Sequence, residues 1–288
     1  MTQLAETRTS GSFGILADLL ASGEAVILSG AGLSTESGIP DYRGPTGLAR
    51  QASGSTPMTY QAFTGSAAAR RRYWARSHLG WRHIAGALPN HGHRAVAELD
   101  RRGLLAGIIT QNVDGLHQAA GASGVTELHG SLHRVICLSC GQRTSRTDLH
   151  RRFTAANPGW DTEPAALINP DGDAVLGAEA TDSFRVVDCA SCHGVLKPDV
   201  VFFGENVPPQ RVEACYALVE RASSLVVLGS SLTVMSGFRY VRHAARRQLP
   251  VVIVNQGSTR GDGYATVTLD APLGQVLTSL VAAIEERR

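Results

Sequence analysis

The stretch AVILSGAG (residues 25–32) decides the fold that the sequence predicts, because an apolar, β-branched run ends there in two glycines. Three further runs have the same form: LLAGIITQN (104–112), SLVVLGSS (224–231) and PVVIVNQG (250–257). Continuous apolar runs of this length indicate strands that are buried on both faces of a parallel sheet. Apolar residues at helical spacing occupy 13–21, 93–102, 209–221, 237–248 and 274–286. This alternation predicts a doubly wound, Rossmann-like α/β domain.

Two regions interrupt this pattern. Residues 43–90 contain no clear strand and are predicted to form a helical or mobile insertion that contacts a cofactor. Residues 131–196 are polar and loop-rich, which indicates a smaller inserted module with a long loop. The Rossmann-like part is then expected to consist of 12–42, 91–130 and 197–285.

Composition excludes several classes of protein. The 288 residues are 43% hydrophobic and 18% charged, which argues against a disordered, collagen-like or coiled-coil chain. The polar start MTQLAETRTS lacks the apolar segment of a secretory signal, and no run is long enough to cross a bilayer. We expect a soluble, cytoplasmic protein with no membrane partner and no direct nucleic-acid partner. Of the 27 basic residues, only Lys197 is a lysine.

The predicted strands end in small or amide residues. Because carboxyl ends of parallel strands meet at one edge of a sheet, these four ends predict a nucleotide site. They read Gly30-Ala31-Gly32, Thr110-Gln111-Asn112, Gly229-Ser230-Ser231 and Asn255-Gln256-Gly257. Thr35 stands where a dehydrogenase fingerprint has its third small residue, so a plain hydride-transfer site is disfavoured. Asp41, Tyr42 and Arg43 instead suit a loop that folds over a cofactor.

Two C-x-x-C pairs, Cys137/Cys140 and Cys189/Cys192, supply four thiolates. Four sulfur ligands complete a tetrahedral shell, so we predict one structural zinc ion, with a redox pair as the alternative. Cys215 lies on an apolar helix face and is expected to be a buried thiol.

Candidate acid–base groups follow the second strand. Asn112 and Asp114 come directly after it, and His129 precedes a glycine in TELHGS (126–131). Carboxylate and amide dipoles suit attack at an anomeric carbon, whose transition state is cationic. Four other histidines, at positions 91, 93, 150 and 243, are expected to be ordinary surface or helix residues.

These motifs occur in the order found in one known family. GAGLS (30–34), GIPDYR (38–43), TQNVDGLH (110–117), ELHG (127–130), KPDVVFFGE (197–205), GSSLTV (229–234) and VNQG (254–257), with the two cysteine pairs, resemble a sirtuin across residues 12–285. RYWAR (72–76), VMSG (234–237) and the insert between the cysteine pairs resemble the class II branch, which includes the mitochondrial lipoamidase-type sirtuin. Because the start of the sequence does not resemble a mitochondrial presequence, we expect a bacterial relative.

The resemblance implies an NAD-dependent protein-lysine deacetylase or deacylase, which releases nicotinamide and forms O-acyl-ADP-ribose. His129 would be the general base, with Asn112 and Asp114 in the nicotinamide pocket. The implied NAD contacts are Gly30, Ala31, Gly32, Ser34, Thr35, Asp41, Tyr42, Arg43, Gln111, Asn112, Val113, Asp114, Gly229, Ser230, Ser231, Asn255, Gln256, Gly257 and Leu273.

The resemblance also implies where an acyl-lysine protein substrate binds. Its peptide would add as a strand beside Val200, Val201, Phe203, Gly204 and Glu205. Tyr73 and Arg76 resemble a pair that holds acidic acyl groups, although a solvated arginine-rich helix is an equal alternative. Protein ADP-ribosylation and lipoamidase-type deacylation are alternative activities, and a non-enzymatic NAD- and zinc-binding regulator is a remote one.

Overall fold

The computed structural model describes residues 2–42, 44, 57–160, 169, 172–174 and 181–287, with the backbone alone for 2–10. A six-stranded parallel sheet has the order β3-β2-β1-β7-β8-β9, which is the Rossmann order 3-2-1-4-5-6. Its strands are β1 (Ala25–Ser29), β2 (Leu105–Thr110), β3 (Val125–Glu127), β7 (Ser224–Leu228), β8 (Val251–Val254) and β9 (Val267–Leu269). The predicted doubly wound sheet is confirmed.

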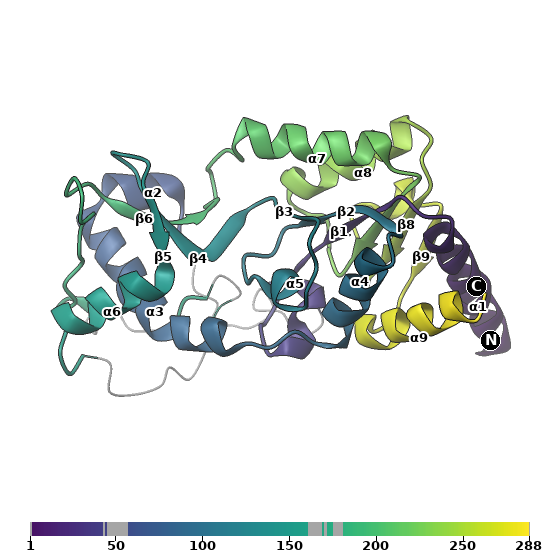
Figure 1. Ribbon diagram of the computed structural model, residues 1–288, viewed down its shortest axis with the longest axis horizontal. Helices are drawn as coiled ribbons and strands as arrows, with labels where there is room; N and C mark the ends of the chain where they lie inside the picture. The colour runs from purple at the N-terminus through teal and green to yellow at the C-terminus, as the bar shows by residue number, and fades with distance from the viewer. Residues whose placement is uncertain are drawn as a thin grey trace.

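Helices cover both faces of this sheet (Figure 1). On one face lie α1 (Thr2–Ala21), α4 (His91–Arg101) and α9 (Leu273–Glu285), and on the other α7 (Pro209–Arg221) and α8 (Met235–Arg246). Alternate residues of β1 serve the two cores, since Ile27 packs on the first face and Leu28 on the second. All five predicted helices are present, but α1 begins well before residue 13.

The register brings the strand ends to one edge. Ser29 at the end of β1 pairs with Thr110 of β2 and with Leu228 of β7. The loops that follow these three strands therefore start side by side. The crevice between β1 and β7 is the place where a doubly wound sheet binds ligands, because chain connections leave in opposite directions there.

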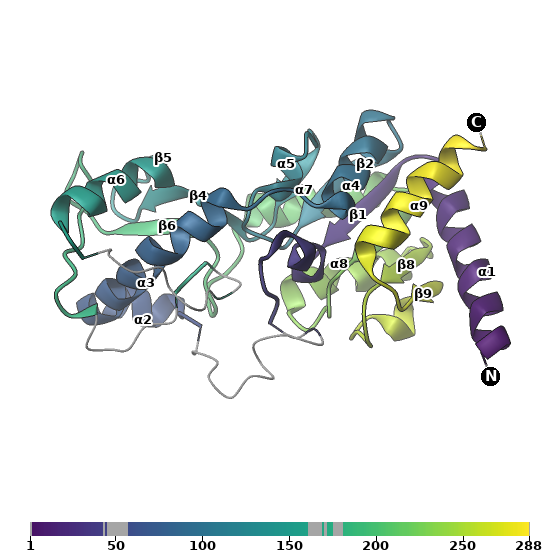
Figure 2. The same cartoon turned by 90° about the horizontal axis from the view of Figure 1, so that it is seen from below.

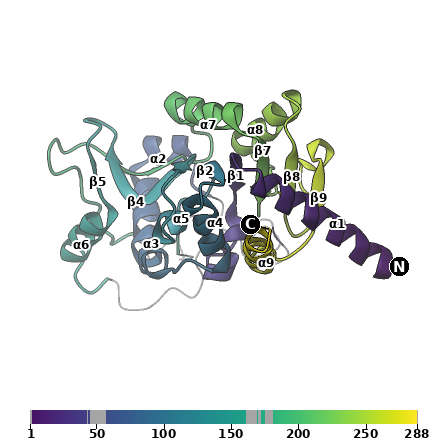
Figure 3. The ribbon, with the colours of Figure 1, turned by 45° about the vertical axis from the view of Figure 1, so that its right-hand side comes forward.

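A smaller, antiparallel sheet with the order β5-β4-β6 forms the other end of the molecule (Figures 2 and 3). Its strands are β4 (Gly130–Cys137), β5 (Arg143–Ser145) and β6 (Leu196–Val200), accompanied by α2 (Tyr60–Gly65), α3 (Ala67–Gly86) and α6 (Arg146–Ala156). The predicted smaller module is confirmed, and α2 and α3 lie within the region that is predicted to be an insertion. The bounds that the sequence suggests for the three parts stay predictions. Strand β6 of the small sheet crosses the one at residue 197.

An aromatic core joins α3 and α6 to the small sheet. Trp74, Trp81 and Phe153 surround the guanidinium of Arg146, whose carbon lies 5.0–5.9 Å from the three ring centroids. Arg146 is only 1% exposed and donates to the Ser77 carbonyl at 3.0 Å.

Of the helices in the described ranges, none is both long and apolar enough to cross a membrane.

Candidate functional site

A cleft of about 800 Å³ opens at the carboxyl edge of the large sheet, between it and the small module. Nearly all predicted site residues line it: Gly30, Ala31, Gly32, Ser34, Thr35, Asp41, Tyr42, Tyr73, Gln111, Asn112, Val113, Asp114, His129, Val200, Val201, Phe203, Gly204, Glu205, Gly229, Ser230, Ser231, Asn255, Gln256, Gly257 and Leu273. Arg43 lies outside the described residues. Arg76 is not among the lining residues.

Glycines let the loops after β1 and β7 touch. A Cβ on Gly30 would lie 2.7 Å from the Cβ of Ser230, and one on Gly229 would lie 2.6 Å from the Leu33 nitrogen. Gly229 also has φ of +62°, which disfavours a side chain there. After Gly30, the chain forms two short 3₁₀ helices, η1 (Ala31–Leu33) and η2 (Thr35–Ser37). Backbone N–H groups in such a turn suit a phosphate, so the cradle fits a dinucleotide.

Ser34 connects the polar groups on the floor of the cleft. Its hydroxyl donates to Oδ2 of Asp114 at 2.7 Å and accepts from Nδ2 of Asn112 at 3.0 Å. Nδ2 of Asn112 also donates to the Gly30 carbonyl at 3.0 Å, so the amide oxygen is the group left for a ligand. Burial raises the pKa of Asp114, against hydrogen bonds from the Leu116 nitrogen and Ser34.

Two histidines that sequence reasoning did not assign to the site lie beneath this floor. His93 is a helix residue, as expected, but it is fully buried, with Nε2 3.5 Å from Ser34 Oγ. Nε2 of His117 lies 2.8 Å from Ser29 Oγ, and the two imidazoles are 5.2 Å apart. Burial lowers the pKa of His93 to about 3 and that of His117 to about 4. Both rings are therefore neutral at physiological pH.

His129 lies at the junction of the two sheets, just before β4. Its Nδ1 is 2.9 Å from the Gln111 carbonyl, which can only accept, so Nδ1 carries the hydrogen. Nε2 is then an acceptor, and it lies 2.7 Å from the hydroxyl of Ser236. Burial, followed by the positive charge of Arg211, lowers the pKa of His129. A neutral imidazole in this tautomer is prepared to take a proton.

The predicted substrate segment follows β6, and Lys197 binds both ends of it. Lys197 is buried; its Nζ donates to the Val200 carbonyl and lies 3.1 Å from Oε2 of Glu205. The same Glu205 oxygen accepts from the Phe202 nitrogen at 2.9 Å. This ion pair fixes the turn that presents Phe203 and Gly204 to the cleft.

Tyr73 and Arg76, the predicted acyl-binding pair, have different surroundings. Tyr73 lines the cleft, within the aromatic core beside Phe63 and Phe202, with ring centroids 5.4 and 5.2 Å away. Arg76, one turn further along α3, donates from Nε to the Ala174 carbonyl at 2.8 Å.

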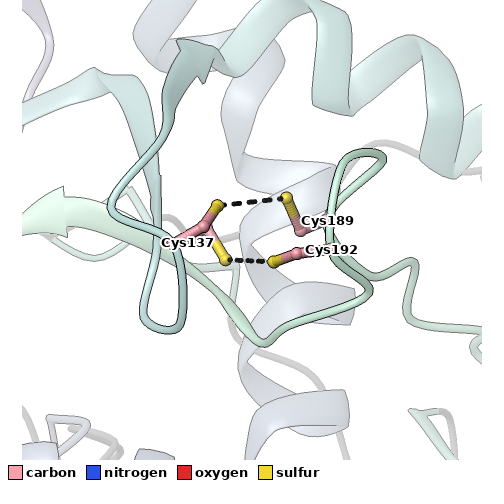
Figure 4. A group of neighbouring side chains, drawn as sticks. Cys137, Cys189 and Cys192 are labelled. Carbon is pink, nitrogen blue, oxygen red and sulfur yellow. Dashed lines mark hydrogen bonds between the residues drawn. The ribbon is translucent and has the colours of Figure 1, made fainter.

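The cysteines of the two C-x-x-C pairs converge in the small module. Figure 4 shows Cys137, Cys189 and Cys192 side by side. The four sulfur atoms all lie within 4.8 Å of one another, with 3.5 Å between Cys137 and Cys192 and 3.9 Å between Cys140 and Cys189. Ligands on one tetrahedral zinc ion, at about 2.3 Å from it, lie about 3.8 Å apart, so the set fits zinc. All five cysteines are free thiols, and Cys215 is buried as predicted.

Comparisons with known proteins agree with this geometry. Residues 30–236 match the model of the Sir2 family. The chain belongs to the Sir2 family. It is 63% identical to NAD-dependent protein deacetylase 1 of Streptomyces coelicolor, over 92% of this chain and 87% of that protein. It is also 46% identical to the mitochondrial NAD-dependent protein lipoamidase sirtuin-4 of Bos taurus, over 88% of this chain and 80% of that protein.

Solved sirtuin structures share the fold. One, described as the structural basis for the mechanism and regulation of Sir2 enzymes, has a TM-score of 0.75 and 28% identity, over 96% of this chain and 99% of that one. A complex of Sir2 with a p53 peptide and NAD⁺ has a TM-score of 0.70 and 30% identity, over 94% and 95%. The predicted sirtuin fold and the similarity to class II members, including bacterial ones, are confirmed.

Proposed function

We propose that this sirtuin removes acyl groups from lysine side chains of proteins and transfers them to ADP-ribose, with NAD as co-substrate. The class of the enzyme, an NAD-dependent protein deacetylase, rests on the family match and on the curated relatives. The observation that carries the mechanism is His129, a half-buried and neutral imidazole whose Nε2 accepts inside the cleft.

The residues on the cleft floor fit the cofactor side of this reaction. When bound, NAD supplies an electrophilic anomeric carbon and nicotinamide as its leaving group. The Gly30 and Gly229 loops would hold the diphosphate, and the buried Asp114 offers an acceptor to the carboxamide of nicotinamide. The Asn112 amide oxygen adds a negative dipole, which favours the positive charge that develops when nicotinamide leaves.

His129 serves the acyl-transfer side. Once the acyl oxygen has replaced nicotinamide at the anomeric carbon, Nε2 would take a proton from a ribose hydroxyl, and that oxygen would attack the acyl carbon and displace the lysine amine. The Gln111 carbonyl holds the ring in the tautomer that this step needs. Because the imidazole is neutral, the base is ready at physiological pH.

Exposed apolar side chains on both sides of the cleft support binding of a peptide between them. Phe203 is 42% exposed on the segment after β6, and Met235, at the start of α8, is also 42% exposed. Both line the cleft. An extended peptide that bonds to the main chain here would tolerate many sequences, so acyl-lysine proteins in general are the proposed partners, met in the cytoplasm.

Acyl preference is the finer part of the proposal. We keep Tyr73 as a residue of the acyl site, because it lines the cleft, whereas Arg76 does not. Acidic or bulky acyl groups are then selected by the shape and hydroxyl of the Tyr73 end of the cleft, without an ion pair to Arg76.

Product analysis with three peptides tests this function. Acetyl-, succinyl- and methylglutaryl-lysine peptides are incubated with NAD and wild type, Tyr73→Phe or, as the control, Arg76→Ala. We expect O-acyl-ADP-ribose as the product, a changed ratio of rates among the peptides for Tyr73→Phe, and an unchanged ratio for Arg76→Ala. ADP-ribosylated protein without O-acyl-ADP-ribose would instead identify an ADP-ribosyltransferase, and a selective loss on acidic peptides in Arg76→Ala would restore that residue to the acyl site.

A further inference from the structure

The base of this site has a neighbour that the sequence did not single out. Ser236 is the second residue of α8 and lines the cleft, with its hydroxyl 2.7 Å from Nε2 of His129. Since Nδ1 donates to the Gln111 carbonyl, Nε2 has only a lone pair, and the serine hydroxyl must be the donor. We propose that Ser236 is a positioning residue: its hydroxyl holds the lone pair of His129 in the free enzyme and yields that place to the ribose hydroxyl. This inference rests on the proposed function of His129.

The start of α8 is built to bring Ser236 to the imidazole. The next residue, Gly237, packs on the side chain of Gln111, and a Cβ there would lie 2.5 Å from Oε1 of Gln111. Gln111 is fixed in turn, because its Nε2 donates to the hydroxyl of Ser230 at 2.8 Å. Gln111 therefore contacts both partners of the Ser236–His129 hydrogen bond. Its carbonyl accepts from the His129 ring, and its side chain packs on the helix that carries Ser236.

The hydrogen bond from Ser236 to Nε2 of His129 has a consequence for proton transfer. A donor on Nε2 stabilises the neutral imidazole and competes with a proton for the same electron pair. The charged groups around the ring are Arg211 on α7, which acts on His129, and Asp199 on β6, which pairs with Arg211 at 3.2 Å. Arg239, one turn beyond Ser236, lines the same cleft. Removal of the serine hydroxyl leaves these charges in place, so its effect on the base is separable from theirs.

Titration of the His129 imidazole by NMR, without substrates, tests the proposal independently of any activity. Compared with wild type, Ser236→Ala should raise the pKa of His129 by about half to one unit, since one neutral hydrogen bond is lost. Ser236→Thr keeps the hydroxyl and should restore the wild-type value. Ser279→Ala, an exposed serine on α9, is the matched control. The same His129 pKa in wild type and Ser236→Ala would overturn the proposal.

The pH dependence of deacylation gives the second readout. The profile of kcat/KM reports the free enzyme, where Ser236 holds the base, so its acid limb should move to higher pH in Ser236→Ala. The profile of kcat reports the bound complex, where the ribose hydroxyl has replaced Ser236, and its acid limb should stay in place. Equal shifts in both profiles would contradict the exchange. A wild type without deacylation would contradict the function of the site, while the NMR titration would still decide on Ser236.

Discussion

A layer of neutral imidazoles supports the cofactor loop from below. His93 and Asn90 form a capping box at the start of α4: the His93 nitrogen donates to Asn90 Oδ1 at 3.1 Å, and the Asn90 nitrogen donates to His93 Nδ1 at 3.4 Å. His117 contacts Ser29 at the end of β1. Burial keeps both rings neutral, so in each ring one nitrogen donates and the other accepts. They place Ser34, and through it Asp114, without adding charge beneath the site.

This layer predicts an acid-sensitive fold. Both pKa values, about 3 and about 4, are below the unfolded value of 6.5, so on acidification the unfolded chain binds protons first. Stability is then complete above pH 6.5 and falls as pH drops toward 4, and each ring costs about 2 kcal/mol at pH 5. Denaturant titrations of wild type and His117→Asn between pH 6.5 and 5 should show a smaller pH dependence in the variant. The exposed His91→Asn is the control, and a variant slope equal to that of wild type would contradict the account.

A hydrogen bond between Glu36 and Gly274 connects the loop after β1 to the last helix, α9. No side chain of the preceding residue caps α9, whose start at Pro272 and Leu273 lacks a side-chain oxygen. Instead, Oε1 of Glu36, on η2, accepts from the Gly274 nitrogen at 3.1 Å. A carboxylate at a helix N-terminus is favoured by the free N–H groups and by the helix dipole.

A double-mutant cycle measures this cap. Gly274→Ala would place a Cβ against the Glu36 carboxylate, so we expect a loss of about 1–2 kcal/mol in unfolding free energy and a higher KM for NAD. With Glu36→Ala already present, the same alanine has space and should cost little or stabilise the helix. Gln275→Ala is the exposed control. An equal cost of Gly274→Ala in both backgrounds would rule out the cap.

Elements with strong local patterns could be predicted from the sequence, and weaker ones could not. Four strands of the large sheet, β1, β2, β7 and β8, were predictable because each lies in a continuous apolar run. The strands β3 and β9 have three residues each, which is too short for a pattern to appear. The site residues at strand ends and the cysteine pairs carry fixed spacing, but Ser236 and His117 become significant only through partners more than 80 positions away.

At the scale of the whole molecule, two sheets meet at His129, the proposed base. The Val201 nitrogen donates to the His129 carbonyl at 2.8 Å, and Gly130, with φ of +82°, packs on the backbone of Asp199 where a side chain could not fit. Asp199 also pairs with Arg211 of the large domain at 3.2 Å. The same junction therefore positions His129, the proposed substrate segment after β6 and the carboxyl edge of the large sheet.

The central claim is that this junction performs NAD-dependent acyl transfer with His129 as the base. Nicotinamide release from NAD in the presence of an acetyl-lysine peptide, measured for wild type and His129→Ala, tests it most directly. Wild type should form nicotinamide, deacetylated peptide and O-acetyl-ADP-ribose in equal amounts. His129→Ala should keep its zinc and its fold but lose about 10²-fold or more in kcat. Turnover near the wild-type rate in His129→Ala would contradict the account.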